Sequence, residues 1–196
     1  MKKLMMIAAM MLMSVGAFAQ EAGQMYIKPM VGATFSTVTS SDDAKMKLGL
    51  VGGAEFGYNV SDAFAVTAGA LYSMQGAKAK ESEVMKDIST TMTYINVPVL
   101  ANYYIIPGLA VKAGIQPGFL VSAKMKYTAG GHDYDYSGTD GYKKVDISIP
   151  LGVSYEFSDF VIDARYNLGL TKIADSDESK SKNSVIMLTI GYKIPF

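Results

Sequence analysis

Apolar residues recur at every second position through most of this sequence, and this alternation constrains the fold more than any other feature. The stretch SVIMLTIGYKIPF, residues 184–196, shows it most clearly. Its alternate apolar positions are Ile186, Leu188, Ile190, Tyr192, Ile194 and Phe196. A period of two is that of a β-strand with one apolar face. The sequence therefore predicts an all-β protein, whose apolar face contacts either a protein core or lipid.

The first twenty residues, MKKLMMIAAMMLMSVGAFAQ, follow a different pattern, that of a secretory signal peptide. Two lysines form a basic start, an apolar run follows, and Ala17-Phe18-Ala19 matches the small-residue cleavage motif. The apolar run is too short to span a bilayer as a helix. We therefore expect residues 1–19 to be removed on export, with cleavage near Ala19, and residues 20–196 to form one mature domain.

Composition excludes several classes of protein. The formal net charge is zero, which provides no basic field for nucleic acid. The absence of cysteine excludes disulfides, thiolate metal sites and cysteine nucleophiles. Charged residues make up 18% of the chain, below the roughly 25% of ordinary soluble domains. The chain is thus predicted to be an exported domain without a nucleic-acid partner or thiol chemistry.

Eight segments of the predicted mature chain carry the alternating pattern. Their approximate bounds are 26–36, 47–58, 63–75, 89–104, 109–124, 142–157, 160–171 and 184–194. Tight turns follow the second, fourth and sixth segments, at 59–62, 106–108 and 158–159. Longer polar stretches follow the first, third, fifth and seventh, at 37–46, 76–88, 125–141 and 172–183. This arrangement is typical of an eight-stranded, antiparallel, up-and-down outer-membrane β-barrel, whose strands cross the bilayer with about 9–11 residues.

The two faces of each segment differ in chemistry. In the segment 160–171, one face carries Ile162, Tyr166 and Leu168, and the other carries Asp163 and Arg165. One Arg or Lys on a lipid-facing surface would cost about 2–4 kcal/mol at the membrane midplane, which explains an uncharged apolar face. We therefore predict that the apolar face contacts lipid. A soluble lipocalin-like barrel, with inside and outside exchanged, is the alternative.

The polar face is expected to line a filled interior, because eight strands leave room only for side chains. The charged residues assigned to this interior are Lys28, Glu55, Lys112, Lys144, Asp146, Glu156, Asp163, Arg165 and Lys193. Buried charges must be paired, and these nearly cancel. The predicted charge network comprises Glu55, Lys112, Asp146, Glu156, Asp163 and Arg165. Within it, Arg165 is expected to bridge Asp163 and the carboxylates of the preceding segment.

The loop GGHDYDYSGTDG contains the only histidine, His132. Together with Asp133, Asp135 and Ser137 it supplies the residue types of a Ser-His-Asp site, but nothing in a Gly-rich loop holds their geometry. Asp133, Asp135 and Ser137 also match the first half of a calcium loop, although Lys144 occupies the place of its bidentate glutamate. We expect at most loose binding of a divalent cation here, and no metal centre, cofactor or catalysis.

Five stretches resemble the PorT-like outer membrane protein beta-barrel domain family. They are ALYSMQGAK (70–78), YINVPVLANYY (94–104), KKVDISIPLGVSYEF (143–157), DARYNLGLTKI (163–173) and LTIGYKIPF (188–196). They are spread over the predicted mature chain in the order found in the family. The resemblance implies an eight-stranded barrel in the outer membrane of a Gram-negative-type cell. It implies no agreed activity, although one branch of the family serves protein secretion.

The C-terminal residues Ile190, Tyr192, Ile194 and Phe196 resemble the signal by which outer-membrane barrels are recognised for insertion. Outer-membrane lipid and the barrel-assembly machinery are therefore the expected partners, and an extracellular or secretion-machine protein is a further candidate. A fold does not fix a function. The sequence favours a structural or surface-interaction protein that presents four extracellular loops. Transport, through a narrow channel or as an accessory of secretion, and the lipocalin-like carrier stay open as alternatives.

Overall fold

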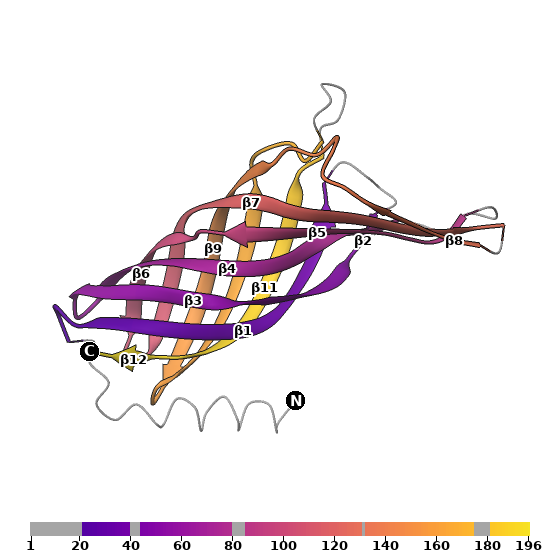
Figure 1. Cartoon of the computed structure of the whole chain (residues 1–196). Helices are drawn as coiled ribbons and strands as arrows, with labels where there is room; N and C mark the ends of the chain where they lie inside the picture. Colours follow the sequence, from indigo (N-terminus) through magenta and orange to yellow (C-terminus); the bar gives the residue numbers. More distant parts are fainter. Residues whose placement is uncertain (1–20, 40–43, 80–84, 131, 175–180) are drawn as a thin grey trace.

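The computed structural model describes residues 21–39, 44–79, 85–130, 132–174 and 181–196. The predicted signal peptide lies outside these residues and stays a prediction. None of the described residues belongs to a helix long and apolar enough to cross a membrane. The regular structure consists of strands (Figure 1), namely β1 (Met25–Val38), β2 (Ala44–Lys45), β3 (Lys47–Ser61), β4 (Phe64–Ala79), β5 (Met85–Asn96), β6 (Val99–Ile106), β7 (Leu109–Ala129), β8 (His132–Ser137), β9 (Val145–Phe157), β10 (Phe160–Gly169), β11 (Asn183–Tyr192) and β12 (Ile194–Pro195).

The strands form one closed antiparallel ring. It closes where β1 pairs with β11, with Gly32 opposite Thr189. The strands β5 and β6 are two parts of one ring strand, interrupted at Val97-Pro98 because proline has no N–H to donate. Likewise, β11 and β12 form one strand interrupted at Lys193. The ring therefore has eight strands, in the order β1, β3, β4, β5/β6, β7, β9, β10 and β11/β12. The predicted fold class is confirmed.

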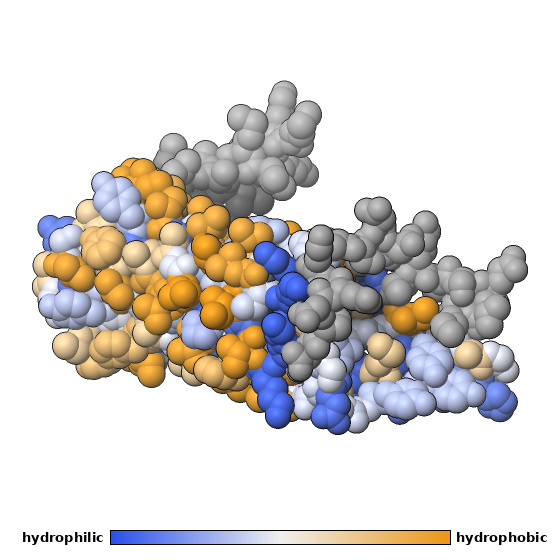
Figure 2. Space-filling model, turned by 90° about the horizontal axis from the view of Figure 1, so that it is seen from above, coloured by the Kyte–Doolittle hydropathy of each residue, from blue (hydrophilic) through white to orange (hydrophobic). Residues whose placement is uncertain are grey.

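Exposure alternates along the strands, and the apolar side chains lie outside the ring. On β10, Ile162 is 44% exposed and Leu168 39%, whereas Asp163 and Arg165 are 1% and 2% exposed. Figure 2 shows the apolar surface that results on one side of the barrel. A closed ring with an apolar outer surface and a polar interior is the arrangement of a membrane-spanning barrel. A lipocalin-like carrier requires the opposite arrangement, so that alternative is wrong.

Tight turns lie at one end of the barrel, as predicted, although the first is at residues 62–63 and residues 59–61 of its predicted bounds belong to β3. They connect β3 to β4, β6 to β7 and β9 to β10, the last two through Pro107-Gly108 and Ser158-Asp159. Gly108 and Ser158 have positive φ values of 83° and 50°. Such left-handed residues reverse the chain direction within a short connection. Because these connections are short, the strands they join are held close together at this end.

At the other end, much of the predicted loop structure is strand instead. Within the predicted loop 76–88, β4 continues to Ala79 and β5 begins at Met85. Within the predicted loop 125–141, β7 continues to Ala129 and β8 follows. The apolar alternation ends at these positions, and that ending predicts loops. A strand surrounded by water needs no apolar face, however, and the Thr and Tyr residues here favour extended structure. Residues 175–180 of the fourth predicted loop lie outside the described residues.

Candidate functional site

A small β-sheet extends past the barrel at the end opposite the tight turns. Its strands lie in the order β8, β7, β5, β4 and β2. Figure 1 shows β5, β7 and β8 reaching well beyond the ring. We call this part the projecting sheet and define it as residues 44–45, 76–79, 85–91, 124–129 and 132–137. Its backbone pairing positions side chains from five strands on a common surface.

Tyrosines gather on one face of the projecting sheet. Tyr127 of β7 lies opposite Tyr134 of β8. Their rings stack with centroids 5.1 Å apart, and Tyr136 stacks on Tyr127 at 6.3 Å. Tyr136 is 63% exposed. Stacked and accessible phenols offer both an aromatic surface and hydrogen-bonding groups, which are properties common in recognition surfaces.

A row of side chains crosses all five strands of the projecting sheet. The successive cross-strand partners are Lys45, Lys78, Ser89, Lys126 and Asp135, from β2 to β8. These residues line an open pocket of about 590 Å³, together with Asp133 and four others. This volume lies in the range of small-molecule sites, roughly 300–1,000 Å³. The pocket is therefore the candidate binding site of the protein.

The two walls of the pocket differ in charge. On the β7–β8 side, Lys126 forms an ion pair with Asp135 at 3.1 Å, and the Thr128 hydroxyl donates to Asp133 at 2.7 Å. On the β2–β4 side, Lys45 and Lys78 are exposed, and neither has an ion-pair partner within the described residues. The site thus has a cationic wall and a wall that contains carboxylates.

Lys47 adds a third ammonium group near the cationic wall. Its Nζ donates to the Ser89 hydroxyl at 2.6 Å and to the Thr91 hydroxyl at 2.5 Å. These hydroxyls fix the position of the ammonium group without neutralising its charge. The positive charge of this wall therefore comes from β2, β3 and β4, beside the hydroxyl-bearing strand β5.

The residues predicted to bind a divalent cation lie on β8, which is a strand and not a loop. Asp133, Asp135 and Ser137 share one face of it, and Thr128 and Lys126 contact the two carboxylates. Alternate side chains of a strand lie about 6–7 Å apart, so they do not close around a cation as a calcium loop does. Among the described residues, no group of three or more His, Cys, Asp or Glu could hold a metal. Cation binding at β8 stays a prediction.

Charged side chains inside the barrel form a continuous alternating chain. Glu55 of β3 binds Lys28 at 2.9 Å and receives two bonds from the Arg165 guanidinium, at 2.5 and 3.0 Å. Arg165 also binds Asp163 at 2.6 and 2.9 Å, and Asp163 binds Lys112 at 2.5 Å. All five are at most 7% exposed. Each carboxylate bridges two cations, which is the pairing that buried charges require.

The predicted partners of Arg165 on β9 are wrong. Gly152 stands opposite Arg165, so Asp146 and Glu156 lie about 20 and 13 Å away along β9, at roughly 3.3 Å per residue. Asp146 instead accepts hydrogen bonds from Thr171 at 2.5 Å and Asn183 at 2.7 Å.

Glu156 belongs to a separate group nearer the tight turns. It pairs with Lys193 at 3.0 Å and accepts from the Tyr104 hydroxyl at 2.7 Å. Lys144 is exposed and lies before β9, so its predicted interior position is wrong as well. With Lys144 removed, the interior charges assigned from the sequence balance, four against four. They are Lys28, Lys112, Arg165 and Lys193, and Glu55, Asp146, Glu156 and Asp163.

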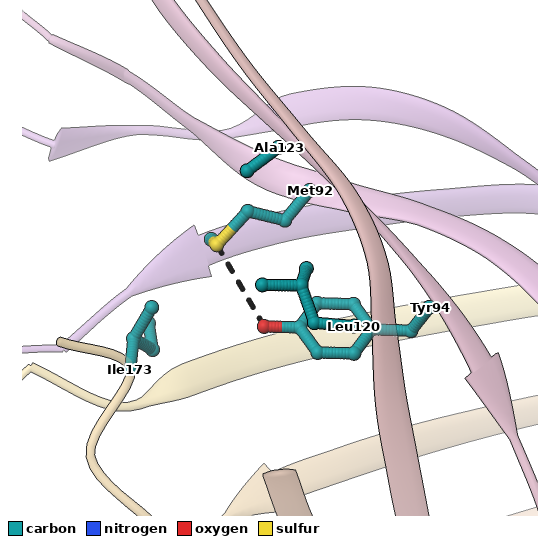
Figure 3. Close-up of a cluster of buried hydrophobic side chains, with 5 residues drawn as sticks. All are labelled: Met92, Tyr94, Leu120, Ala123 and Ile173. Atoms are coloured by element: carbon teal, nitrogen blue, oxygen red, sulfur yellow. Dashed lines mark hydrogen bonds between the residues drawn. The ribbon is translucent and has the colours of Figure 1, made fainter. Parts of the chain in front are cut away.

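An apolar cluster fills the interior between the charged chain and the projecting sheet. Figure 3 shows its members, which are Met92, Tyr94, Leu120, Ala123 and Ile173. The Tyr94 hydroxyl lies 3.7 Å from the Met92 sulfur and 3.4 Å from the Asn183 amide nitrogen. Tyr94 and Met92 are 1% and 2% exposed. The interior therefore carries a charged layer and an apolar layer in series, and both are packed.

The family model described as outer membrane protein beta-barrel domain matches residues 18–175. The chain belongs to this family. Its localisation is accordingly the outer membrane, and its apolar outer surface contacts lipid. A search of curated proteins gave no significant match.

Solved outer-membrane barrels share the architecture of this family member. The crystal structure of Ail, the attachment invasion locus protein of Yersinia pestis, matches with a TM-score of 0.53 and 19% identity, over 88% of this chain and 99% of Ail. Ail in complex with the heparin analogue sucrose octasulfate matches with a TM-score of 0.52 and 20% identity, over the same shares. Neisserial surface protein A matches with a TM-score of 0.50 and 15% identity, over 88% of this chain and 97% of that one. These identities show a common fold only.

The C-terminal residues of this barrel domain lie on its lipid-facing side. Ile190, Tyr192, Ile194 and Phe196 are 48%, 42%, 44% and 71% exposed. The Phe196 ring lies 6.1 Å from that of Phe56, and the Phe196 N–H donates to the Met25 carbonyl at 3.0 Å. The last residue thus contacts β1 and β3 at the seam of the ring. Its role as an insertion signal stays a prediction.

Sequence reasoning did not anticipate the pocket or the stacked tyrosines. One signal for them was present in the sequence. In the stretches KMKYTA (124–129) and HDYDYS (132–137), polar or charged residues alternate with aromatic or apolar ones. The two stretches flank a pair of glycines, which is the sequence pattern of a β-hairpin. The alternation there is of charged with aromatic or apolar residues, so a search for apolar faces alone overlooks it. The pairing of Lys45 with Lys78 has no comparable local signal.

Proposed function

We propose that this protein is a non-catalytic binding protein of the cell surface, in which the filled barrel anchors the projecting sheet outside the cell. The observation that carries the proposal is the pocket on the projecting sheet, which five strands build and which lies apart from the interior. A membrane anchor alone would not need a five-stranded extension with two chemically distinct faces. We therefore assign the function to the sheet.

The position of the sheet outside the cell follows from a general property of outer-membrane barrels. Their turns are short on the periplasmic side and their connections are longer on the extracellular side. In this barrel the tight turns lie at one end and the projecting sheet at the other. The sheet would accordingly face the surroundings of the cell, together with the connection that contains residues 172–174 and 181–183.

The solved structures of similar architecture support a surface role. Ail is the attachment invasion locus protein of Yersinia pestis, and one of its structures contains a heparin analogue. Neisserial surface protein A is named for its location. Their identities to this chain are below 25%, so the role is carried over as a proposal only. The sequence suggests four extracellular loops. In this proposal, two of them are the strand extensions of β4–β5 and β7–β8, and the other two are the connections after β1 and after β10.

The competing function is transport, either through a narrow channel or as an accessory of secretion in the manner of one PorT-like branch. Membership of the PorT-like group is likewise a proposal. The charged chain around Arg165 and the apolar cluster around Tyr94 both argue against a water-filled path. The second candidate therefore depends on an interior different from the one described, and the ion conductance considered in the Discussion separates the two.

Shortening the β7–β8 hairpin is expected to abolish ligand binding while leaving the barrel folded. Lys124 and Ser137 are opposite each other, so residues 125–136 can be replaced by Asn-Gly, which forms a two-residue hairpin turn. We expect folded wild-type protein in detergent to bind at least one class of glycan on an array. The shortened variant should lose that binding by at least roughly tenfold, which corresponds to about 1.4 kcal/mol.

Both proteins must first show the same shift in gel mobility between unheated and boiled samples, which reports a closed barrel. Variant Lys143→Gln serves as a matched control for surface chemistry, because Lys143 is exposed and lies outside the projecting sheet. Equal glycan binding by the wild type and the shortened variant would show that the projecting sheet does not bind the ligand.

A further inference from the structure

We propose that the pocket on the projecting sheet binds a saccharide that carries a phosphate or sulfate ester at one end. In this arrangement Lys45 and Lys78 bind the ester, and Asp133 and Asp135 accept hydrogen bonds from sugar hydroxyls. This inference rests on the proposed function, because it requires the sheet to face the outside of the cell. It specifies the chemical class of the ligand and the residues that distinguish its two ends.

Within the part of the chain that the structure describes, the lysines of the cationic wall have no carboxylate partner. Lys45 and Lys78 are direct cross-strand partners on β2 and β4. Like charges directly opposite each other destabilise a pair of strands. The ammonium group of Lys47, held by Ser89 and Thr91, adds to the same field. An anion bound between these lysines would relieve their repulsion, and its oxygens would receive charge-assisted hydrogen bonds.

The hydroxyl of Ser89 contributes a neutral polar group beside the cationic wall. Ser89 lies between Lys78 and Lys126 in the row that crosses the sheet. The row therefore changes from cation to hydroxyl to ion pair across the four strands β4, β5, β7 and β8. Neighbouring strands lie about 4.8 Å apart, so the distance from Lys78 to Asp135 across β5 and β7 is about 14 Å. Lysine carries its ammonium group on a flexible four-carbon stem, so a sugar phosphate shorter than this backbone separation can contact both walls.

The carboxylates on the other wall restrict the type of anion. Asp135 contacts Lys126 and Asp133 contacts Thr128, and both carboxylates line the pocket. A ligand charged along its whole length would bring negative groups against these carboxylates. A ligand with its charge at one end and hydroxyls at the other meets complementary groups on both walls. The pocket volume of about 590 Å³ also exceeds what an inorganic anion needs.

Binding of glucose 6-phosphate to the folded barrel in non-ionic detergent tests this assignment by calorimetry. It should bind more tightly than inorganic phosphate and than glucose, since only the sugar phosphate contacts both walls. The Lys45→Gln and Lys78→Gln substitutions should each weaken binding by roughly tenfold, as expected for the loss of one charge-assisted hydrogen bond. Lys143→Gln, an equal charge change outside the pocket, should change it less than twofold.

The Asp135→Asn substitution distinguishes the two walls. It should reduce the advantage of glucose 6-phosphate over inorganic phosphate, because only the sugar reaches this carboxylate. Equal affinities for glucose 6-phosphate and inorganic phosphate in the wild type would overturn the inference. Unchanged binding in both lysine variants would also overturn it. If hairpin shortening abolishes glycan binding while both lysine variants bind normally, the proposed function stands and only this inference fails.

Phosphorylated sugars reach the outer surface both as free saccharides and as headgroups of membrane glycolipids. Vesicles containing phosphorylated lipid A or its dephosphorylated form, with the barrel reconstituted in them, separate the two sources. Weaker binding of glucose 6-phosphate in the phosphorylated vesicles only would identify the lipid headgroup as the natural occupant. Equal binding in both would identify a free saccharide.

Discussion

Replacing Arg165 with leucine is expected to lower the free energy of unfolding by about 3–5 kcal/mol, the usual cost of removing one partner from a buried ion pair. Arg165 donates four hydrogen bonds to the carboxylates of Glu55 and Asp163. Leucine would leave Glu55 with only Lys28 and Asp163 with only Lys112, in a place where water cannot solvate them. Denaturant unfolding in detergent micelles, followed by the gel-mobility shift, measures the loss.

Two further variants separate charge from geometry in this prediction. Arg165→Lys keeps the positive charge but cannot form two bidentate contacts, so an intermediate loss is expected. Leu168→Ile changes a lipid-facing residue of the same strand and should leave the unfolding midpoint nearly unchanged. An Arg165→Leu barrel as stable as the wild type would show that the charged chain does not hold the interior together.

Deletion of Phe196 is expected to remove most of the membrane-inserted protein in cells. The motivation is the unbroken apolar register of Ile190, Tyr192 and Ile194, which ends at this aromatic residue. Quantifying the protein in the outer-membrane fraction tests this expectation, with Ser181→Ala as a single-residue control outside the register. Equal membrane yields for the deletion and the control would contradict an insertion signal.

The structure adds a second explanation for any effect of that deletion. The Phe196 N–H bonds the Met25 carbonyl and the ring lies near Phe56, so the deletion also removes contacts at the seam. Phe196→Ala retains the backbone bond and removes only the ring. If the ring is the recognised group, this variant should insert as poorly as the deletion. Normal insertion of Phe196→Ala would assign the effect of the deletion to the loss of the backbone hydrogen bond with Met25 instead.

The sequence predicts which charged residues lie inside the barrel far better than it predicts which of them form ion pairs with one another. Alternation decides the face of a residue, so Glu55, Asp163 and Arg165 could be placed in the interior from parity alone. Pairing across the interior depends on ring closure and on the stagger of strands, which no local pattern reports. Glu55 and Arg165 are 110 residues apart in sequence. The sequence predicted partners for Arg165 on the adjacent strand β9. That prediction is wrong because the stagger of the strands brings Glu55 of β3 to Arg165 instead.

The projecting sheet shows the opposite difficulty. Its strands follow local pairing, and Gly130 follows the end of β7 with a positive φ of 59°, yet its faces are charged and aromatic instead of apolar. Apolar alternation is a signal of burial as much as of strand structure. Where both faces of a sheet contact water, the apolar alternation is absent, and only the pairing of strands defines the sheet. The pocket between Lys78 and Asp135 could therefore not be foreseen without the strand order.

The most direct test of the account is the ion conductance of the wild-type barrel in planar bilayers. If the projecting sheet carries the function, the charged chain through Arg165 and the apolar cluster around Tyr94 close the interior. The predicted result is no stable conductance step after insertion, under conditions in which an open porin conducts. A reproducible conductance step of defined size would contradict the account, because it would reveal a water path through the barrel and make transport the better assignment.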